Sequence, residues 1–149
     1  MNPIAILNTA QSILVIDWPS KEVPETLTRA GFQVFVKGGP EPENYSTYEV
    51  DEGKVVSRYL GHPPQKADLV YSYRPFNELR EILALASKLQ AKTLWTQSGL
   101  SAAGTNDAKG CWLPEDQFQS ARSLVEAAGL HHITEPYIAD AAREARATR

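Results

Sequence analysis

The sequence has few residues that would cross-link the chain or place it in a membrane. It holds one cysteine, Cys111, among 149 residues, which excludes an internal disulfide and a cysteine-rich metal cluster. No apolar run approaches the roughly 18 residues that a membrane-spanning helix needs. The N-terminus lacks a basic segment followed by a long apolar stretch, so no signal peptide is evident. We therefore expect a cytoplasmic protein without a membrane partner.

Positive charge is also scarce. The chain carries 15 Lys and Arg residues against 18 Asp and Glu residues, for a formal net charge of -3. A protein that binds nucleic acid by neutralising the phosphate backbone needs a basic face, so the charge balance argues against a nucleic-acid partner. The length and a hydrophobic content of 42% predict a single domain over residues 1–149 that buries its own core.

Glycine is missing where a nucleotide-binding domain most needs it. The apolar run Ile13–Ile16 ends at a polar turn, and no glycine appears before Gly31. A dinucleotide-binding Rossmann unit carries the motif G-x-G-x-x-G at this turn, which lets the backbone approach the pyrophosphate. A standard dinucleotide site is therefore disfavoured. The residues of the turn are Asp17, Trp18, Pro19, Ser20 and Lys21.

Short apolar runs alternate with segments of helical period along the rest of the chain. This alternation predicts an α/β fold: a three-layer Rossmann-like domain with a mostly parallel five-stranded sheet. The strands are expected at Ile13–Ile16, Gln33–Val36, Asp68–Ser72, Thr93–Thr96 and His131–Thr134. Helices are expected at Pro3–Gln11, Lys21–Ala30 (with Ser20 as N-cap), Pro75–Gln90, Pro114–Ala128 and Ile138–Arg146.

The segment Lys37–Lys66 is too long for an ordinary connection between two parallel strands. Within it, Tyr45–Val50 and Lys54–Tyr59 flank the sequence Asp51-Glu52-Gly53, which is typical of a hairpin turn. Loops of this size are usually functional or contain an inserted substructure. We therefore expect an enlarged loop that includes a hairpin.

Candidate site residues follow from the strand ends, because open α/β sheets bind ligands beyond the carboxyl ends of their strands. Lys37, Arg74 and Lys21 supply positive charge there, and helix N-termini with nearby cations bind phosphate. Trp18, Tyr73 or Phe76 offers a ring that stacks on a base. The pattern predicts a nucleotide-like ligand. Its candidate residues are Asp17, Trp18, Pro19, Ser20, Lys21, Lys37, Tyr73, Arg74, Thr96, Gln97 and Ser98.

Lys37 also bears on the kind of nucleotide. An NAD-binding unit places an acidic residue at the end of its second strand, where it holds the ribose hydroxyls. A lysine at that position suits an additional phosphate, as in NADP or the 3′-phosphate of coenzyme A. NAD is therefore disfavoured.

Two segments resemble those of a known family. Asp68–Arg74 is similar to the third strand, and Leu94–Leu100 to the fourth strand, of the small CoA-binding domain proteins; Ala127–Leu130 is a weaker match. The Rossmann-like domain of this family also forms the nucleotide-binding part of the succinyl-CoA synthetase alpha subunit. The resemblance runs from about Ile13 to Arg143.

The resemblance implies a non-catalytic binding domain for coenzyme A or an acyl-CoA. The pyrophosphate would lie at residues 17–21 and the 3′-phosphate near Lys37, with further contacts from Tyr73, Arg74 and residues 96–98. The chain departs from the family in having Asp17 and Trp18 where glycine and serine are usual. It also has Lys37-Gly38-Gly39-Pro40 at the second strand end, and Tyr137 where the final strand commonly leads into a cysteine.

Two alternatives stay open. The missing glycines and the enlarged loop suit an interaction or regulatory protein that kept the fold and lost the ligand, and Trp18 folded over the strand ends would favour it. Lys37 also permits an NADP-dependent enzyme, but the sequence shows no nucleophile–base pair, so catalysis is not expected. His62, His131 and His132 lack metal-ligand spacing, so no metal site is expected. The sequence identifies no protein partner.

Overall fold

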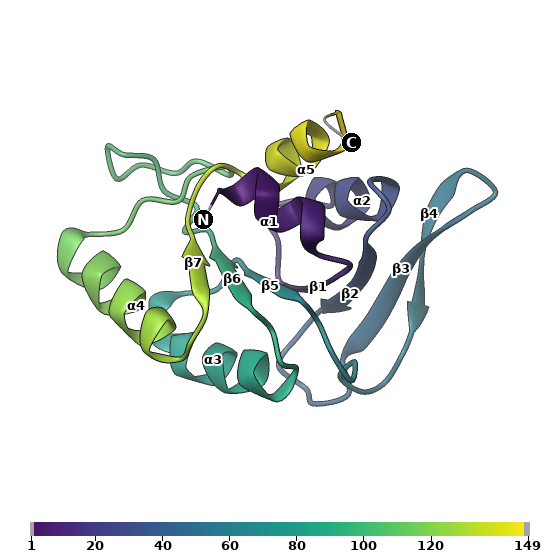
Figure 1. The fold of residues 1–149 in the computed structure, drawn as a ribbon, viewed down its shortest axis with the longest axis horizontal. Helices are drawn as coiled ribbons and strands as arrows, with labels where there is room; N and C mark the ends of the chain where they lie inside the picture. The colour runs from purple at the N-terminus through teal and green to yellow at the C-terminus, as the bar shows by residue number, and fades with distance from the viewer. Residues whose placement is uncertain (1, 148–149) are drawn as a thin grey trace.

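A computed structural model describes residues 2–147 and has one mixed sheet covered by helices on both faces (Figure 1). The strand order is β4-β3-β2-β1-β5-β6-β7. The strands are β1 (Ser12–Ile16), β2 (Gln33–Lys37), β3 (Tyr45–Asp51), β4 (Lys54–Tyr59), β5 (Leu69–Ser72), β6 (Thr93–Thr96) and β7 (His131–Ile133). The helices are α1 (Pro3–Thr9), α2 (Glu22–Arg29), the short 3-10 helix η1 (Phe76–Glu78), α3 (Leu79–Lys88), α4 (Glu115–Ala127) and α5 (Ile138–Ala147).

The sheet has seven strands, so the expectation of five was wrong. The five expected parallel strands are present as β1, β2, β5, β6 and β7. The two extra strands come from the hairpin in the 37–66 segment, because β3 pairs antiparallel with the outer edge of β2. Tyr45 at the start of β3 is 3% exposed and packs in the core. Burial of this end therefore docks the hairpin onto the sheet.

The hairpin turn has the geometry that its sequence indicates. Glu52 and Gly53 both have positive φ angles, of 53° and 79°, as a two-residue type I′ turn requires. Asp51 is the last residue of β3 and faces Lys54 rather than lying in the turn. This turn matches the right-handed twist of the two strands that it joins.

Two helical layers cover the central strands. Ile13 and Val15 of β1 point into a core shared with α1, α2 and α5, whereas Leu14 and Ile16 point into the core beneath α3 and α4. Figure 1 shows these two groups of helices on opposite sides of the sheet. All five residues of β1 are buried. Near-continuous apolarity is what strands buried on both faces require.

Two helix starts differ from those expected. Pro75 has an extended backbone, with ψ of 154°, so the chain makes the 3-10 turn η1 before α3 begins at Leu79. The N-cap of α2 is Lys21 rather than Ser20. Ser20 still assists the helix start, because its Oγ accepts a hydrogen bond from the Glu22 amide at 3.3 Å. No helix within residues 2–147 is long and apolar enough to cross a membrane.

The order of the strands reverses between β1 and β5. From β1 the chain crosses to β2 on one side, adds the hairpin, and returns to β5 on the other side of β1. In open α/β sheets the connections diverge at such a switch point and leave a crevice beyond the carboxyl ends of the strands. The fold therefore places a crevice next to Asp17 and Arg74.

Candidate functional site

A cavity of about 490 Å³ opens at the carboxyl ends of β1, β5 and β6. Asp17 lines it from β1, Tyr73 and Arg74 line it from β5, and the end of β6 contributes the residues that follow it. The switch point thus brings together side chains that are far apart in the sequence. Of the predicted site residues, the cavity contains Asp17, Tyr73, Arg74, Thr96, Gln97 and Ser98.

The opposite wall of this cavity is apolar, and apart from Phe76 its residues were not predicted as part of a site. It is built by η1, α3, the connection between β6 and α4, and α4 itself. The apolar stripe of α3 is visible in the sequence, but such a stripe indicates core packing as well as it indicates the wall of a cavity. The wall residues are Phe76, Leu79, Ile82, Leu100, Leu113 and Ala121.

A second cavity of about 370 Å³ adjoins the first at the end of β2. It is lined by Lys37, Gly38 and Gly39, and it shares Asp17, Arg74 and Ile82 with the first cavity. Lys37 and Arg74, both predicted as phosphate ligands, therefore face one hollow. The same hollow also contains Glu78 and Glu81, which the sequence analysis did not assign to the site.

Arg74 stands between the two cavities and is held by two carboxylates. Its Nη1 lies 2.9 Å from Asp17 Oδ2, and its Nη2 lies 2.6 Å from Glu78 Oε2. The hydrogen bonds that Arg74 donates to Glu78, and then to Asp17, raise the pKa of Arg74 above its already high ordinary value. The guanidinium is therefore oriented but its charge is compensated. The i,i+4 spacing of Arg74 and Glu78 in the sequence indicates the ion pair between them.

Asp17 has an unusual backbone for a residue with a side chain. Its φ of 60° lies in the left-handed region that glycine favours. Asp17 Oδ1 accepts a hydrogen bond from the Trp18 amide at 2.8 Å, and local bonds of this kind let aspartate tolerate the conformation. The first turn thus keeps a glycine-like shape while presenting a carboxylate to Arg74.

Lys37 is also engaged by the protein. Its ammonium group donates a hydrogen bond to the Gly39 carbonyl and lies 5.9 Å from the centre of the Tyr45 ring. These contacts hold the side chain across the glycine turn, at the mouth of the second cavity. The Gly38 amide already donates to the Asn44 carbonyl, at 3.1 Å. A phosphate at Gly39 would meet an oriented cation there.

Gln97 anchors the long connection over residues 97–114. It is 5% exposed; its Oε1 accepts a hydrogen bond from the Tyr71 hydroxyl at 2.5 Å, and its Nε2 donates one to the Ala108 carbonyl. Burial raises the pKa of Tyr71 far above its ordinary value, so this hydroxyl stays a donor. The side chain of Gln97 therefore acts as a tether, and both of its polar atoms are already used.

The same connection is closed by a tight backbone contact. The amides of Ser98 and Gly99 donate to the Gly110 carbonyl at 3.1 and 3.0 Å. A Cβ atom at Gly110 would lie 2.0 Å from the Leu100 carbonyl oxygen, so only glycine fits. This contact holds Cys111 and Leu113 against the first cavity.

Two titratable groups near the cavity are held neutral. Burial, with smaller contributions from Glu135 and Asp107, raises the pKa of the Cys111 thiol above its ordinary value. Burial, and then the charge of Arg122, lowers the pKa of His132 to about 4. His132 Nε2 lies 2.9 Å from Thr96 Oγ1, directly behind the cavity wall.

The turn after β1 places its other predicted residues elsewhere. Trp18 packs against the core on the side of α1, α2 and α5, so it does not fill the crevice. Neither of the two cavities is lined by Trp18, Pro19, Ser20 or Lys21. No group of His, Cys, Asp and Glu suited to a metal ion occurs in the described part of the chain.

Comparisons with known proteins extend only to the fold. No protein-family model matches the chain, and no curated protein matches it either. A solved structure titled "The structure of cell-free ID.343 from Thermus thermophilus" is similar, with a TM-score of 0.55 and 22% sequence identity. The match covers 97% of this chain and 99% of the Thermus chain. It shows that the arrangement of strands and helices is shared over nearly the whole length.

The buried His132 predicts a loss of stability in mild acid. Its pKa of about 4 in the folded state lies below the ordinary value of 6.5, so the unfolded chain binds the proton more tightly. The free energy of unfolding should therefore fall as the pH drops from 6.5 towards 4. Urea titrations of the wild type and His132→Gln should show that about 3 kcal/mol of the loss between pH 7 and pH 4 disappears in the variant. A loss of the same size in His132→Gln and in the wild type would contradict this assignment.

The closed backbone contact predicts that Gly110→Ala destabilises the protein. The added methyl group must displace the backbone at Leu100, so we expect a loss of about 2 kcal/mol or more in the free energy of unfolding. Gly38→Ala is the matched control, because its Cβ would meet only the Asn44 side chain, at 3.4 Å. Urea denaturation should show a clearly lower free energy of unfolding for Gly110→Ala than for Gly38→Ala. Equal values would show that the backbone at Leu100 can move without loss of stability, which would contradict the prediction.

Proposed function

We propose that this chain is a non-catalytic binding domain for coenzyme A or an acyl-CoA. The observation that carries the proposal is the pair of adjoining cavities, about 490 and about 370 Å³, at the switch point between β1 and β5. They share Asp17, Arg74 and Ile82, so one elongated ligand can occupy both. Crevices at this place in α/β sheets are the usual ligand sites.

The two cavities differ in chemistry as the two ends of an acyl-CoA do. The first has the apolar wall of Phe76, Leu100 and Leu113, which suits a pantetheine arm and an attached acyl chain. The second offers Lys37 and the backbone of Gly39, which suits the 3′-phosphate end. The resemblance of Asp68–Arg74 and Leu94–Leu100 to CoA-binding proteins supports the same ligand, with its 3′-phosphate near Lys37.

Arg74 would contact the pyrophosphate in this arrangement. Its guanidinium lies where the two cavities meet, and a phosphate could replace either carboxylate as its partner. Asp17 would oppose this exchange, because its charge repels the phosphate and competes for the same nitrogen. Binding therefore depends on Lys37 and on the apolar wall as well as on Arg74.

The groups around the crevice support binding rather than catalysis. The Cys111 thiol is kept protonated by burial, and His132 is neutral and bonded to Thr96. Neither is activated as a nucleophile or a base. This is also the reason that we favour a CoA-binding domain over an NADP-dependent enzyme.

A second candidate function is an interaction protein that retained the fold and lost the ligand. The full compensation of Arg74 by Asp17 and Glu78 favours it, because a phosphate site usually has unpaired positive charge. The packing of Trp18 on the α2 side of the sheet weighs against it, since the crevice is left open. Ligand titration decides between the two candidates.

Calorimetric titration with CoA tests the proposal. We expect the wild type to bind CoA with a dissociation constant below about 1 mM, and the double variant Lys37→Ala, Arg74→Ala to bind at least about tenfold more weakly. The control is the double variant Arg80→Ala, Lys92→Ala, which removes two exposed cations outside the cavities. Thermal unfolding checks that both variants are folded. An absence of binding by the wild type at millimolar CoA would overturn the proposal.

Two further ligands sharpen this titration. Dephospho-CoA lacks the 3′-phosphate, so the single variant Lys37→Ala should weaken CoA binding and leave dephospho-CoA binding unchanged. Tighter binding of NADP than of CoA would instead favour the remaining alternative, an NADP-dependent enzyme.

Asp17→Asn should strengthen CoA binding about threefold or more. The substitution removes the charge that competes for Arg74, while asparagine tolerates the left-handed backbone and keeps the local hydrogen bond. Glu126→Gln, an exposed residue of α4, changes the net charge by the same amount outside both cavities and should leave the affinity unchanged. Weaker binding by Asp17→Asn would show that the carboxylate positions Arg74 rather than competes for it.

A further inference from the structure

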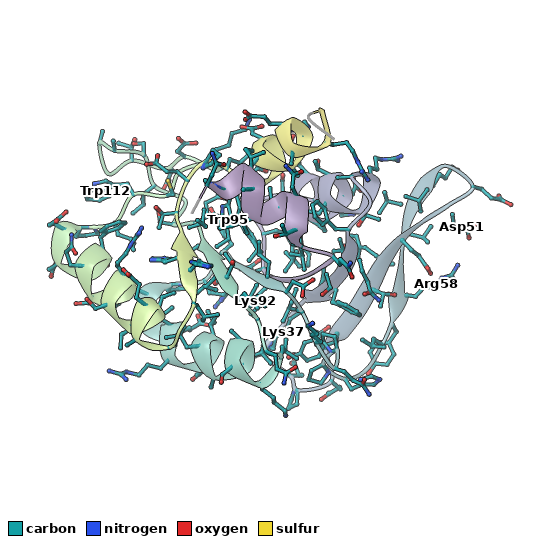
Figure 2. The ribbon with its side chains drawn as sticks, viewed as in Figure 1. Lys37, Asp51, Arg58, Lys92, Trp95 and Trp112 are labelled. Atoms are coloured by element: carbon teal, nitrogen blue, oxygen red, sulfur yellow. The ribbon has the colours of Figure 1, made fainter. Side chains whose placement is uncertain are left out.

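The β3–β4 hairpin extends the sheet as an arm beyond the helical layers (Figure 1). Figure 2 shows Asp51 and Arg58 on this arm, at the side of the molecule away from α4. Within residues 2–147, β4 pairs with β3 alone, so it forms the outer edge of the sheet. The strand Lys54–Tyr59 contains no proline to block further pairing.

Apolar side chains gather on one face of the arm. The register pairs Tyr48 with Ser57 and Val50 with Val55, which places these residues and Tyr59 on the face that continues from α2. Val50 is 49% exposed and Tyr59 is 74% exposed. On the opposite face, charged residues dominate. An exposed edge that joins apolar side chains to unpaired backbone groups favours association.

The register also identifies the backbone groups that point outward. The two-residue turn makes Asp51 and Lys54 a hydrogen-bonded pair, and the Leu60 amide donates to the Tyr45 carbonyl at 2.9 Å. Even-numbered residues of β4 therefore direct their backbone groups at β3. The amides and carbonyls of Val55, Ser57 and Tyr59 point away from the sheet.

We propose that β4 pairs antiparallel with β4 of a second copy of this chain, around a two-fold axis at Ser57. The two sheets then join into one continuous sheet. Ser57 faces Ser57 of the second copy, and Val55 faces Tyr59 of the second copy on both sides of the axis. Each of these pairs exchanges two hydrogen bonds through the outward-pointing backbone groups.

Charge selects this register among the neighbouring ones. An axis at Val56 would place Lys54 opposite Arg58 of the second copy, and an axis at Arg58 would place two arginines opposite each other. Like charges directly across a ladder are destabilising. With the axis at Ser57, Arg58 instead lies opposite Val56, and the apolar Val55 and Tyr59 cover each other.

The charged face of the arm permits two copies to approach. Arg58 forms ion pairs with Glu49 and with Asp51 of its own hairpin, the latter at 3.3 Å. The positive charge of Arg58 is therefore compensated within each copy. A second copy is favoured over another partner because the strand is self-complementary about Ser57, and a two-fold contact closes on itself.

Sedimentation measurements test the proposal. The paired edge is short compared with a standard interface of about 1,600 Å², so we expect a monomer–dimer equilibrium that shifts between about 10 μM and about 1 mM protein. Ser57→Pro removes an outward amide that the monomer does not use, so the fold should persist while the dimer dissociates at least about tenfold more readily. Ser57→Ala keeps the amide and should dimerise like the wild type.

The result that overturns the proposal is a monomer at every concentration, or an equal dissociation constant for Ser57→Pro and the wild type. If thermal unfolding shows that Ser57→Pro is misfolded, amide exchange of the wild type decides. Exchange at Val55, Ser57 and Tyr59 should slow as the concentration rises, while exchange at Val56 and Arg58 stays constant; no concentration dependence at the first three refutes the pairing. These readouts involve no ligand, so they stand apart from CoA binding.

Discussion

Burial of β1 and β5 on both faces is the constraint on which the rest of the structure depends. Every residue of these two strands is buried, so a polar group within them needs a partner inside the protein. The Tyr71 hydroxyl meets this need through Gln97, and Ser12 does so through the backbone amide of Asp68. All charged side chains of this region are consequently displaced to the strand ends. The switch point then determines which of them meet.

The hydrogen bond between Tyr71 and Gln97 links the buried strand β5 to the connection that forms one wall of the crevice. Gln97 holds the Ala108 carbonyl, and the Gly110 contact closes the same connection a few residues later. Leu100 and Leu113 thereby line the first cavity together with residues of α3 and α4, which creates an apolar wall on an otherwise polar edge. A hydrogen bond in the core thus shapes a surface cavity, because the connection has no regular secondary structure of its own.

The sequence predicts the parallel part of the sheet well, because continuous apolar runs are required of strands covered on both sides. It predicts the hairpin but not the pairing of the hairpin with β2. The strand β3 is mostly polar, and its pairing with β2 depends on the burial of Tyr45 in the core. At the crevice, the strand-end rule identifies six residues that line the first cavity. It fails for Trp18–Lys21, because the left-handed backbone at Asp17 turns the chain towards α2. The ion pair of Arg74 with Asp17 is likewise set by tertiary geometry.

The compensated Arg74 determines what kind of ligand the proposed site can select. Two carboxylates fix the Arg74 guanidinium in place, so its side chain loses little entropy when a ligand binds. A bound phosphate, however, would only replace one negatively charged partner of Arg74 with another. The net gain from this exchange is therefore small, and a simple phosphate would gain little from the crevice. A ligand that also reaches the Gly38–Gly39 turn and the wall at Leu100 adds two contributions that do not depend on Arg74. Under the proposed function, the crevice would consequently favour elongated ligands with an anionic end and an apolar arm over compact anions.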